Sequence, residues 1–198
     1  MSEQPTGGEP PIADMPATSW AVLGILSFED ELSGYDVKRW ADQSLAFFYW
    51  APSHSQIYAE LRRLESLGLA SSRVEQTHAA KSRRLYAITD AGRDRMREWA
   101  DELAPESVML KHAVLLRVWG AHNGRLGRLR DVLEGYRDDA LGRAERAAEH
   151  AENAEEVPAW HYSSLALEWA SRYHRDEAAR IDWLLERLGP DFDREDEE

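Results

Sequence analysis

The sequence predicts a mainly α-helical protein with a small β-hairpin, in which an N-terminal winged helix-turn-helix domain precedes a C-terminal helical dimerisation domain. Three observations support this fold class. Residues 53–68 place apolar side chains at helical spacing behind a helix-capping pattern. Two strand-like runs follow at 69–76 and 83–88, separated by a short polar segment. Beyond Pro105 the apolar spacing is helical almost to the end of the chain.

The composition limits the kind of protein that this chain can be. Its 198 residues, of which 43% are hydrophobic and 31% charged, are enough for one domain and an accessory one. The absence of cysteine excludes disulfides, thiolate zinc sites and cysteine nucleophiles. Residues 1–17 contain no Lys or Arg, and the apolar run Trp20–Leu26 is too short to span a membrane. We therefore expect a cytoplasmic protein without a membrane segment.

Composition also divides the chain into four stretches. The sequence predicts a disordered leader at 1–17, the winged helix-turn-helix domain at 18–104, the helical domain at 105–190 and an acidic tail at 191–198. The leader is rich in proline and glycine, which disfavour regular structure. The tail reads DFDREDEE, and such a run of like charges is expected to stay in solvent.

Two helices and an aromatic cluster are predicted at the start of the winged domain. A buried helix over Trp20–Phe28 would be capped by Thr18 or Ser19, and a second helix would begin after Ser33. The cluster Phe47–Trp50 is too apolar to lie in water. We therefore expect it in the core or at a subunit contact.

The stretch from Ser53 to Gly68 carries the clearest functional pattern. Ser53 and Gln56 are spaced as a capping box, which starts a helix, and Gly68 is a natural residue to end it. The apolar face of this helix holds Ile57, Leu61 and Leu64. The residues expected to face the major groove of DNA are Ser53, Gln56, Tyr58 and Arg62. Ordinary surface helices share this pattern, so the stretch alone leaves both interpretations open.

The predicted hairpin adds local positive charge. The chain has a net charge of −13, but the segment from Ser53 to Arg84 has six basic and three acidic side chains. Phosphates respond to local charge within about a Debye length, roughly 8–10 Å, so a basic patch on an acidic protein can bind DNA. We expect Lys81, Arg83 and Arg84, together with Tyr35, to contact phosphates. Arginines on a hairpin edge also prevent edge-to-edge aggregation, which is the alternative role.

Three motifs occur in the order and spacing of a known family. SGYDVKR at 33–39, WAPSHSQIYAELRRLESLGL at 50–69 and RRLYAITDAGR at 83–93 resemble the PadR-family transcriptional regulators. The resemblance implies a bacterial homodimeric regulator, usually a repressor, that binds a double-stranded DNA operator with two-fold symmetry. The DNA contacts that it implies are Tyr35, Ser53, Gln56, Tyr58 and Lys81. The chain departs from the family at Ala59, where many members have proline, and at the hairpin tip, which lacks the usual glycines.

The C-terminal domain is predicted to contain three helices and to join two subunits. A helix over 108–119 is apolar nearly all round, so we expect it to be buried. A long helix over 125–155 keeps an a/d pattern that thins to alanines, and a last helix runs from Pro158 to Gly189. The apolar face of the last helix comprises Tyr162, Leu165, Trp169, Tyr173, Leu184 and Leu188. One short helix cannot cover two long apolar faces, so we expect a second copy of the chain to do so.

No pattern supports an enzyme or a metal site. The motifs of hydrolases, nucleotide-binding loops and zinc proteases are absent, and the seven histidines include no i, i+4 pair. We therefore expect neither catalysis nor a cofactor. A winged helix that binds only other proteins is the alternative function. The acidic net charge favours that alternative, and the basic segment disfavours it.

Three tryptophans are candidates for binding a small aromatic effector. Trp50, Trp99 and Trp119 lie near the predicted junction of the two domains. Regulators of the resembled family often release DNA when an aromatic compound binds there, and an aromatic-lined pocket suits such a ligand. Core packing is the more ordinary role for each of them.

Overall fold

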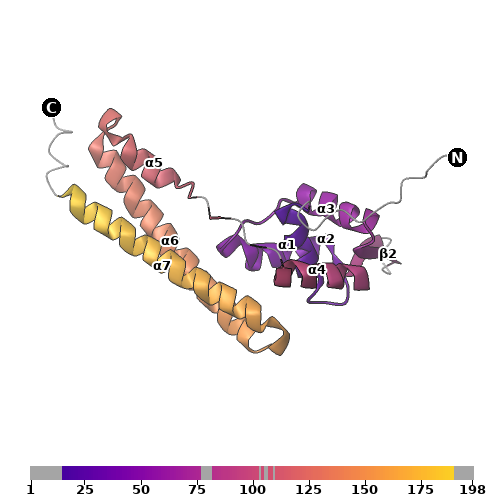
Figure 1. The fold of residues 1–198 in the computed structure, drawn as a ribbon. Coiled ribbons are helices and arrows are strands. Elements are labelled where there is room, and N and C mark those ends of the chain that lie inside the picture. The colour runs from indigo at the N-terminus through magenta and orange to yellow at the C-terminus, as the bar shows by residue number, and fades with distance from the viewer. Residues whose placement is uncertain (1–14, 77–81, 103, 105–106, 109, 190–198) are drawn as a thin grey trace. The chain divides into compact units, whose positions relative to one another are not determined.

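The chain divides into two units, Met1–Glu106 and Ser107–Glu198 (Figure 1). The computed structural model describes residues 15–76, 82–102, 104, 107–108 and 110–189. The predicted acidic tail lies outside the described residues, as does the predicted leader up to residue 14. Met15, which the sequence assigns to the leader, belongs to the buried core of the first unit.

The first unit is a winged helix-turn-helix, as the sequence predicts. Its elements in chain order are α1 (Ala17–Leu26), β1 (Leu32–Ser33), α2 (Gly34–Gln43), the 3-10 turn η2 (Leu45–Phe47), α3 (His54–Ser66), β2 (Ala70–Gln76), β3 (Ser82–Ile88) and α4 (Asp90–Glu102). The strands form an antiparallel sheet in the order β1–β3–β2. In its register Arg73 lies opposite Leu85 and Glu75 lies opposite Arg83.

Large aliphatic side chains fill the core of this unit. Fully buried side chains include Leu23 and Leu26 of α1 and Ile57, Leu61 and Leu64 of α3. The apolar stripe predicted for the third helix is therefore confirmed. Gly68 follows this helix with φ of +72°, a left-handed conformation that glycine adopts without the strain of a side chain.

The start of α1 differs from the prediction. Neither Thr18 nor Ser19 caps the helix, because it already begins at Ala17 with Pro16 as its N-cap. Ser19 is fully buried instead, and its hydroxyl donates a hydrogen bond to Glu60 of α3. A tertiary contact thus uses the hydroxyl that local sequence assigns to capping.

Two further features of the first unit differ from the prediction. The sheet has a third strand, since Leu32 pairs with Tyr86 and Ser33 pairs with Leu85. Two residues are too short for any alternating pattern to reveal a strand. In the predicted aromatic cluster only Phe47 is buried, whereas Phe48, Tyr49 and Trp50 are exposed in the single chain. Core burial was therefore the wrong expectation for those three.

The second unit is entirely helical where it is described. Its elements are α5 (Ala113–Trp119), η3 (Ala121–Asn123), α6 (Leu126–Glu155), η4 (Pro158–Trp160) and α7 (His161–Leu188). The two long helices α6 and α7 lie side by side over most of their length (Figure 1). In the described residues no helix is long and apolar enough to cross a membrane.

Small side chains hold α6 and α7 together over much of their contact. Ala144, Ala147 and Ala151 of α6 are buried. From α7, Ser164 donates a hydrogen bond to the carbonyl of Ala151 (3.1 Å) and Ser171 donates one to the carbonyl of Ala144 (2.9 Å). Larger side chains meet at one end, where Val114, Leu129, Leu133, Ile181 and Leu185 form a buried cluster. The predicted a/d pattern of the long helix is therefore confirmed at Leu129, Leu133 and Ala140, which are buried.

The helix predicted over 108–119 is shorter and more exposed than expected. It begins only at Ala113, after His112, whose Nδ1 accepts the Leu115 backbone N–H as a cap (3.2 Å). Val114 is its one buried side chain, and Trp119 is 79% exposed. A short helix that packs on α6 can cover only one of its own faces, so apolar residues all round it do not produce burial within one chain.

The apolar face predicted for the last helix is also largely exposed. Tyr162 is 82% exposed and Trp169 is 58% exposed, because α7 turns its serines and alanines toward α6 instead. Only Leu184 and Leu188 of the predicted face pack against the buried cluster of the unit.

Candidate nucleic-acid interface

The helices α2 and α3 begin with matching caps. At the start of α2, Ser33 and Asp36 form a capping box, and at the start of α3 Ser53 and Gln56 form another, as predicted. The ring of Tyr35 in α2 stacks on His54 in α3, with centroids 6.4 Å apart and planes at 20°. The amino-terminal ends of both helices therefore adjoin, and Tyr35 remains mostly exposed beside them.

Tyr58 lies directly over the first residue of α2. A Cβ atom built on Gly34 would be 2.4 Å from Cε1 of the Tyr58 ring, which is far inside van der Waals contact. Only glycine leaves room for the ring at this position. The Tyr58 side chain, 40% exposed, thus spans from α3 to α2 at the surface where the two helices begin.

The side chains of Ser53 and Gln56 are engaged at the start of α3. The Gln56 Oε1 accepts the Ser53 backbone N–H at 2.8 Å, and the Ser53 hydroxyl accepts the Gln56 backbone N–H at 3.4 Å. The cap uses the carbonyl oxygen of the Gln56 amide. Its amide nitrogen is the atom that can donate to a base or a phosphate.

Arg62 lies one turn further along α3 and is exposed. Burial raises the pKa of the Tyr86 hydroxyl, while the charges of Arg84 and Arg62 act against that rise. The charges of Arg62 on α3 and Arg84 on β3 thus act on the same hydroxyl.

Arg83 and Arg84 lie on opposite faces of the wing, because neighbouring side chains of a strand alternate. Arg84 lies near α3: its Nη1 is 3.3 Å from the Ser72 hydroxyl and 3.7 Å from Glu65 Oε2. The Ser72 hydroxyl in turn donates to Glu65 Oε1 at 2.6 Å. The predicted single basic edge is thus divided between two surfaces.

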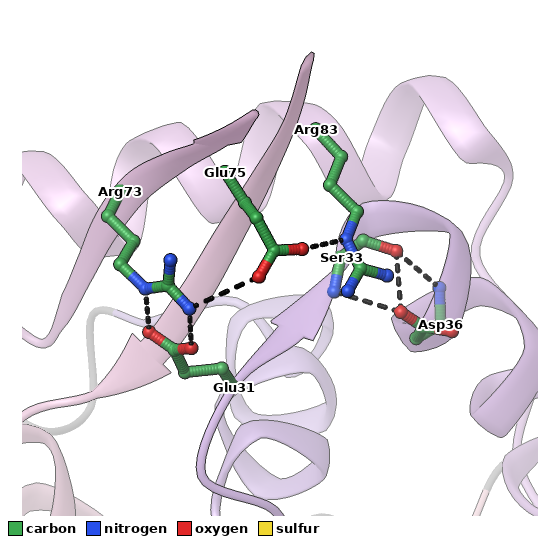
Figure 2. Close-up of polar contacts among 6 residues, drawn as sticks. All are labelled: Glu31, Ser33, Asp36, Arg73, Glu75 and Arg83. Atoms are coloured by element: carbon green, nitrogen blue, oxygen red, sulfur yellow. Dashed lines mark hydrogen bonds and ion pairs between the residues drawn. The ribbon is translucent and has the colours of Figure 1, made fainter. Parts of the chain in front are cut away.

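Arg83 takes part in a chain of alternating charges on the other face (Figure 2). Its Nε is 2.5 Å from Glu75 Oε2, and Glu75 Oε1 is 3.6 Å from Nη2 of Arg73. Arg73 forms a bidentate ion pair with Glu31, in which its Nε donates to Oε1 at 2.6 Å and its Nη2 donates to Oε2. We refer to Glu31, Arg73, Glu75 and Arg83 as the wing ion-pair chain.

The charge of the wing ion-pair chain extends to the start of α2. The hydrogen bond from Arg73 holds the pKa of Glu31 below its ordinary value, although desolvation acts in the opposite direction. The pKa of Asp36 is also lowered, first by the Ser33 hydroxyl and, to a smaller degree, by the charge of Arg83. The wing ion-pair chain therefore adjoins the start of α2, the helix that carries Tyr35.

Lys81, the remaining predicted phosphate contact, lies outside the described residues.

The three predicted effector residues are described. Trp99 of α4 stacks on the buried Trp20 at 5.6 Å, and Trp50 lies at 5.6 Å from the Tyr49 ring. Trp119 ends α5 in the second unit. Among the described residues, no three histidine or acidic side chains gather as a metal site.

Comparison with known proteins identifies the first unit. Residues 22–98 match the transcriptional regulator PadR-like family. This segment is a PadR-like domain. The chain is 30% identical over 105 residues to the negative transcriptional regulator PadR of Bacillus subtilis, a match that covers 53% of this chain and 57% of that protein. It is 35% identical over 78 residues to a probable transcriptional regulator of Mycobacterium tuberculosis, covering 39% and 41%. The matches thus span about half the length of these relatives.

Solved structures extend the likeness in fold to the second unit. The crystal structure of B. subtilis PadR in complex with operator DNA has a TM-score of 0.74 at 23% identity, covering 87% of this chain and 99% of that one. The structure of the same regulator in complex with p-coumaric acid has a TM-score of 0.66 at 21% identity, covering 91% and 98%. Over the part of the chain that these matches cover, the fold is therefore similar to that of B. subtilis PadR.

The PadR-like domain contains residues at this surface that sequence patterns did not single out. His54 stacks on Tyr35, and Arg73 joins two carboxylates, but neither was a predicted site residue. The stacked pair is 19 positions apart in sequence, and no periodic pattern connects the two. The partners of Arg73 depend on strand register and on a loop residue before β1, and neither can be derived from spacing alone.

Proposed function

We propose that this chain is a homodimeric transcriptional regulator, a repressor that binds a double-stranded operator with two-fold symmetry. The observation that carries this proposal is the exposed surface where α2 and α3 of a PadR-like domain begin together. The relative from B. subtilis is named a negative regulator, and a structure of that protein holds operator DNA. The likeness therefore supports both the DNA partner and the repressor role.

The start of α3 would enter the major groove in this proposal. Helices of this kind contact base edges with their first turns, and the free N–H groups there attract phosphate. Gln56, Tyr58 and Arg62 would face the bases, while Tyr35 and Ser53 lie at the rim of the same surface. On the wing, Lys81, Arg83 and Arg84 would contact the sugar-phosphate backbone, which sets position and not sequence.

A second copy of the chain would complete the C-terminal unit. The exposed stripe on α7 contains Tyr162, Leu165, Trp169 and Tyr173, of which the last two are stacked with centroids 5.4 Å apart. Monomeric proteins rarely leave such a stripe in water, whereas two-fold dimers bury it. Dimerisation also sets two reading helices about one helical turn of DNA apart, roughly 34 Å.

A small aromatic compound would act as the effector, through Trp50, Trp99 and Trp119. The support is that all three side chains are partly or largely exposed in the described structure. In addition, B. subtilis PadR is known in complex with p-coumaric acid. Titration of tryptophan emission with phenolic acids tests this role. Operator binding that is unchanged by every compound that alters emission would contradict it.

DNA binding is tested by selecting bound fragments from genomic DNA and measuring affinity by fluorescence anisotropy. We expect Arg62→Ala to reduce discrimination between operator and altered base pairs by about 1–3 kcal/mol. Gln56→Glu keeps the capping box but removes the amide donor, so it separates base contact from helix stability. Arg97→Ala is the control, since Arg97 is an exposed arginine of α4 paired with Asp94 at 2.6 Å. A wild-type chain that binds no duplex at low salt would contradict the proposal and leave the protein-interaction role.

Dimerisation is tested by sedimentation velocity over a range of concentrations. We expect Trp169→Ala to weaken association by about 2 kcal/mol or more, because stacked aromatics at interface centres dominate binding. Tyr35→Ala removes an exposed aromatic from the other unit and should leave association unchanged. A wild-type chain that sediments as a monomer at all concentrations would refute the two-fold operator as well.

A further inference from the structure

The arginines of the wing are already neutralised by the protein itself. Arg73 and Arg83 are held by Glu31 and Glu75, in side-chain pairs that are roughly half exposed to solvent on the arginine side (Figure 2). The whole unit is acidic as well, since residues 15–106 carry 11 Lys and Arg side chains against 14 Asp and Glu. The local positive charge expected from the sequence is therefore not freely available on this face.

A phosphate that approaches Arg83 meets the carboxylate of Glu75 at the same guanidinium group. Carboxylate and phosphate make similar charge-assisted hydrogen bonds to arginine, so the exchange of one for the other gains little. The displaced carboxylate stays close to the phosphate and repels it. Both effects reduce the favourable contribution of phosphate contacts, which supply essentially all sequence-independent DNA binding.

The position of this face makes the competition relevant to DNA. The wing ion-pair chain adjoins the start of α2, where Asp36 senses the charge of Arg83 and where Tyr35 stacks on His54 of α3. The face is thus continuous with the surface that the proposed function assigns to DNA. The base-reading side chains of α3 lie on a different element, and no described hydrogen bond or ion pair joins them to Glu31 or Glu75.

We propose that Glu31 and Glu75 act as an electrostatic brake on DNA binding, holding Arg73 and Arg83 so that phosphates engage them only in competition with carboxylates. This inference rests on the proposed function. The brake lowers affinity for every duplex and leaves the preference among base sequences to α3. It keeps the chain from occupying DNA through its wing alone.

The test measures the salt dependence of binding to the selected operator and to a scrambled duplex. Glu31→Gln combined with Glu75→Gln keeps side-chain size and removes the competing charges. Each released arginine should steepen the slope of log affinity against log salt by about 0.9. The double variant should therefore lose about 12-fold more affinity than wild type between 50 and 200 mM salt, if both arginines engage phosphate. The ratio of operator to scrambled affinity at one salt concentration should stay the same, because the base contacts are unchanged.

Asp94→Asn is the control for net charge, compared per charge removed. It removes one negative charge, where the double variant removes two, from an exposed carboxylate paired with an arginine on α4. Adding Arg83→Gln and Arg73→Gln to the double variant should abolish the increase in the salt slope. That result would show that the increase depends on these arginines. Thermal unfolding of each variant reports whether its fold is intact.

Two results would overturn the brake. One is a slope in the double variant that changes by no more than twice the change in Asp94→Asn. The other is an increase in the salt slope that remains after Arg73 and Arg83 are both replaced by glutamine. The proposed function fails separately, when the wild-type chain itself binds neither duplex at low salt.

Discussion

The two units of this chain bury different kinds of side chain. In the first unit, Leu23, Ile57 and Leu61 are fully buried, and the aliphatic core is complete within one chain. In the second unit, alanines and serines occupy much of the contact between α6 and α7, while Tyr162 and Trp169 point into solvent. A large aliphatic core stabilises a single domain, whereas a seam of small residues brings helices close and buries little area. The first unit therefore has an aliphatic core of its own, whereas the second leaves a broad aromatic face exposed in the single chain, which is the face that the proposed dimer would cover.

Cavity formation in the aliphatic core should have the largest effect. Leu61→Ala removes a fully buried side chain of α3 and should cost about 2–5 kcal/mol of unfolding free energy. Urea denaturation of the full chain, followed by tryptophan emission, measures this loss. Leu141→Ala is the control, because Leu141 is exposed on α6 and should change stability by no more than about 0.5 kcal/mol. Equal losses of unfolding free energy for the two substitutions would contradict the difference in core packing between the units.

A larger side chain among the buried alanines and serines between α6 and α7, which we call the small-residue seam, should have an intermediate effect on stability. Ala147 is fully buried between the long helices, so Ala147→Leu forces them apart and should cost about 1–3 kcal/mol. Circular dichroism during denaturation follows this change, since the second unit is helical. Gly135→Leu is the control for added size on α6, because a Cβ at Gly135 meets no atom within 4 Å. A stabilised Ala147→Leu protein would mean that the seam is not closely packed.

The smallest effect is expected from a buried polar cluster in the second unit. His112 Nε2 is 2.8 Å from Glu177 Oε2, and Tyr136 donates to the same oxygen at 3.3 Å. Because His112 Nδ1 accepts the Leu115 N–H, the ring proton lies on Nε2 and is donated to the carboxylate. Burial acts to raise the pKa of Glu177, but the hydrogen bond and charge of His112, with Arg180 and Tyr136, lower it below its ordinary 4.5.

This lowered pKa makes the cluster sensitive to acid. A carboxyl whose pKa is lower in the folded state stabilises the fold above its unfolded pKa and loses that contribution as pH falls through the folded value. We therefore expect stability to decline as pH falls below about 4.5, and Glu177→Gln to flatten that part of the profile. Denaturation midpoints measured between pH 6 and pH 3 check this, with Glu168→Gln on the exposed side of α7 as the control. A Glu177→Gln profile as steep as wild type would contradict it.

Local sequence was sufficient for features that depend on a few neighbouring residues. The capping box predicted at Ser53 is present, Ser33 caps α2, and the stripe of Ile57, Leu61 and Leu64 is buried as its spacing predicts. Each depends on contacts within one or two helical turns, which periodicity describes directly. The two hairpin strands and the break at Gly68 follow from equally local preferences.

The candidate site was predictable in its helix and less so in its wing. Tyr35, Tyr58 and Arg62 are found on the exposed side of α2 and α3, where the sequence expects them. The separation of Arg83 from Arg84 follows from strand alternation, which the expected single basic edge overlooked. The stack of Tyr35 on His54 joins residues from two helices, and no local pattern encodes it.

The sequence by itself determined where α3 begins and ends, where the two hairpin strands lie, and which family the first unit resembles. Only the tertiary structure decided which face of α7 lies against α6, and which carboxylate each wing arginine meets. A helix cap and a periodic apolar stripe depend on residues that are close together along the chain, so both can be recognised in the sequence before the tertiary structure is known. Helix contacts and ion pairs between distant residues depend on how closely two surfaces approach. Over much of the contact, alanine and serine lie between α6 and α7 instead of the aromatic residues, because small side chains let the two helices approach closely.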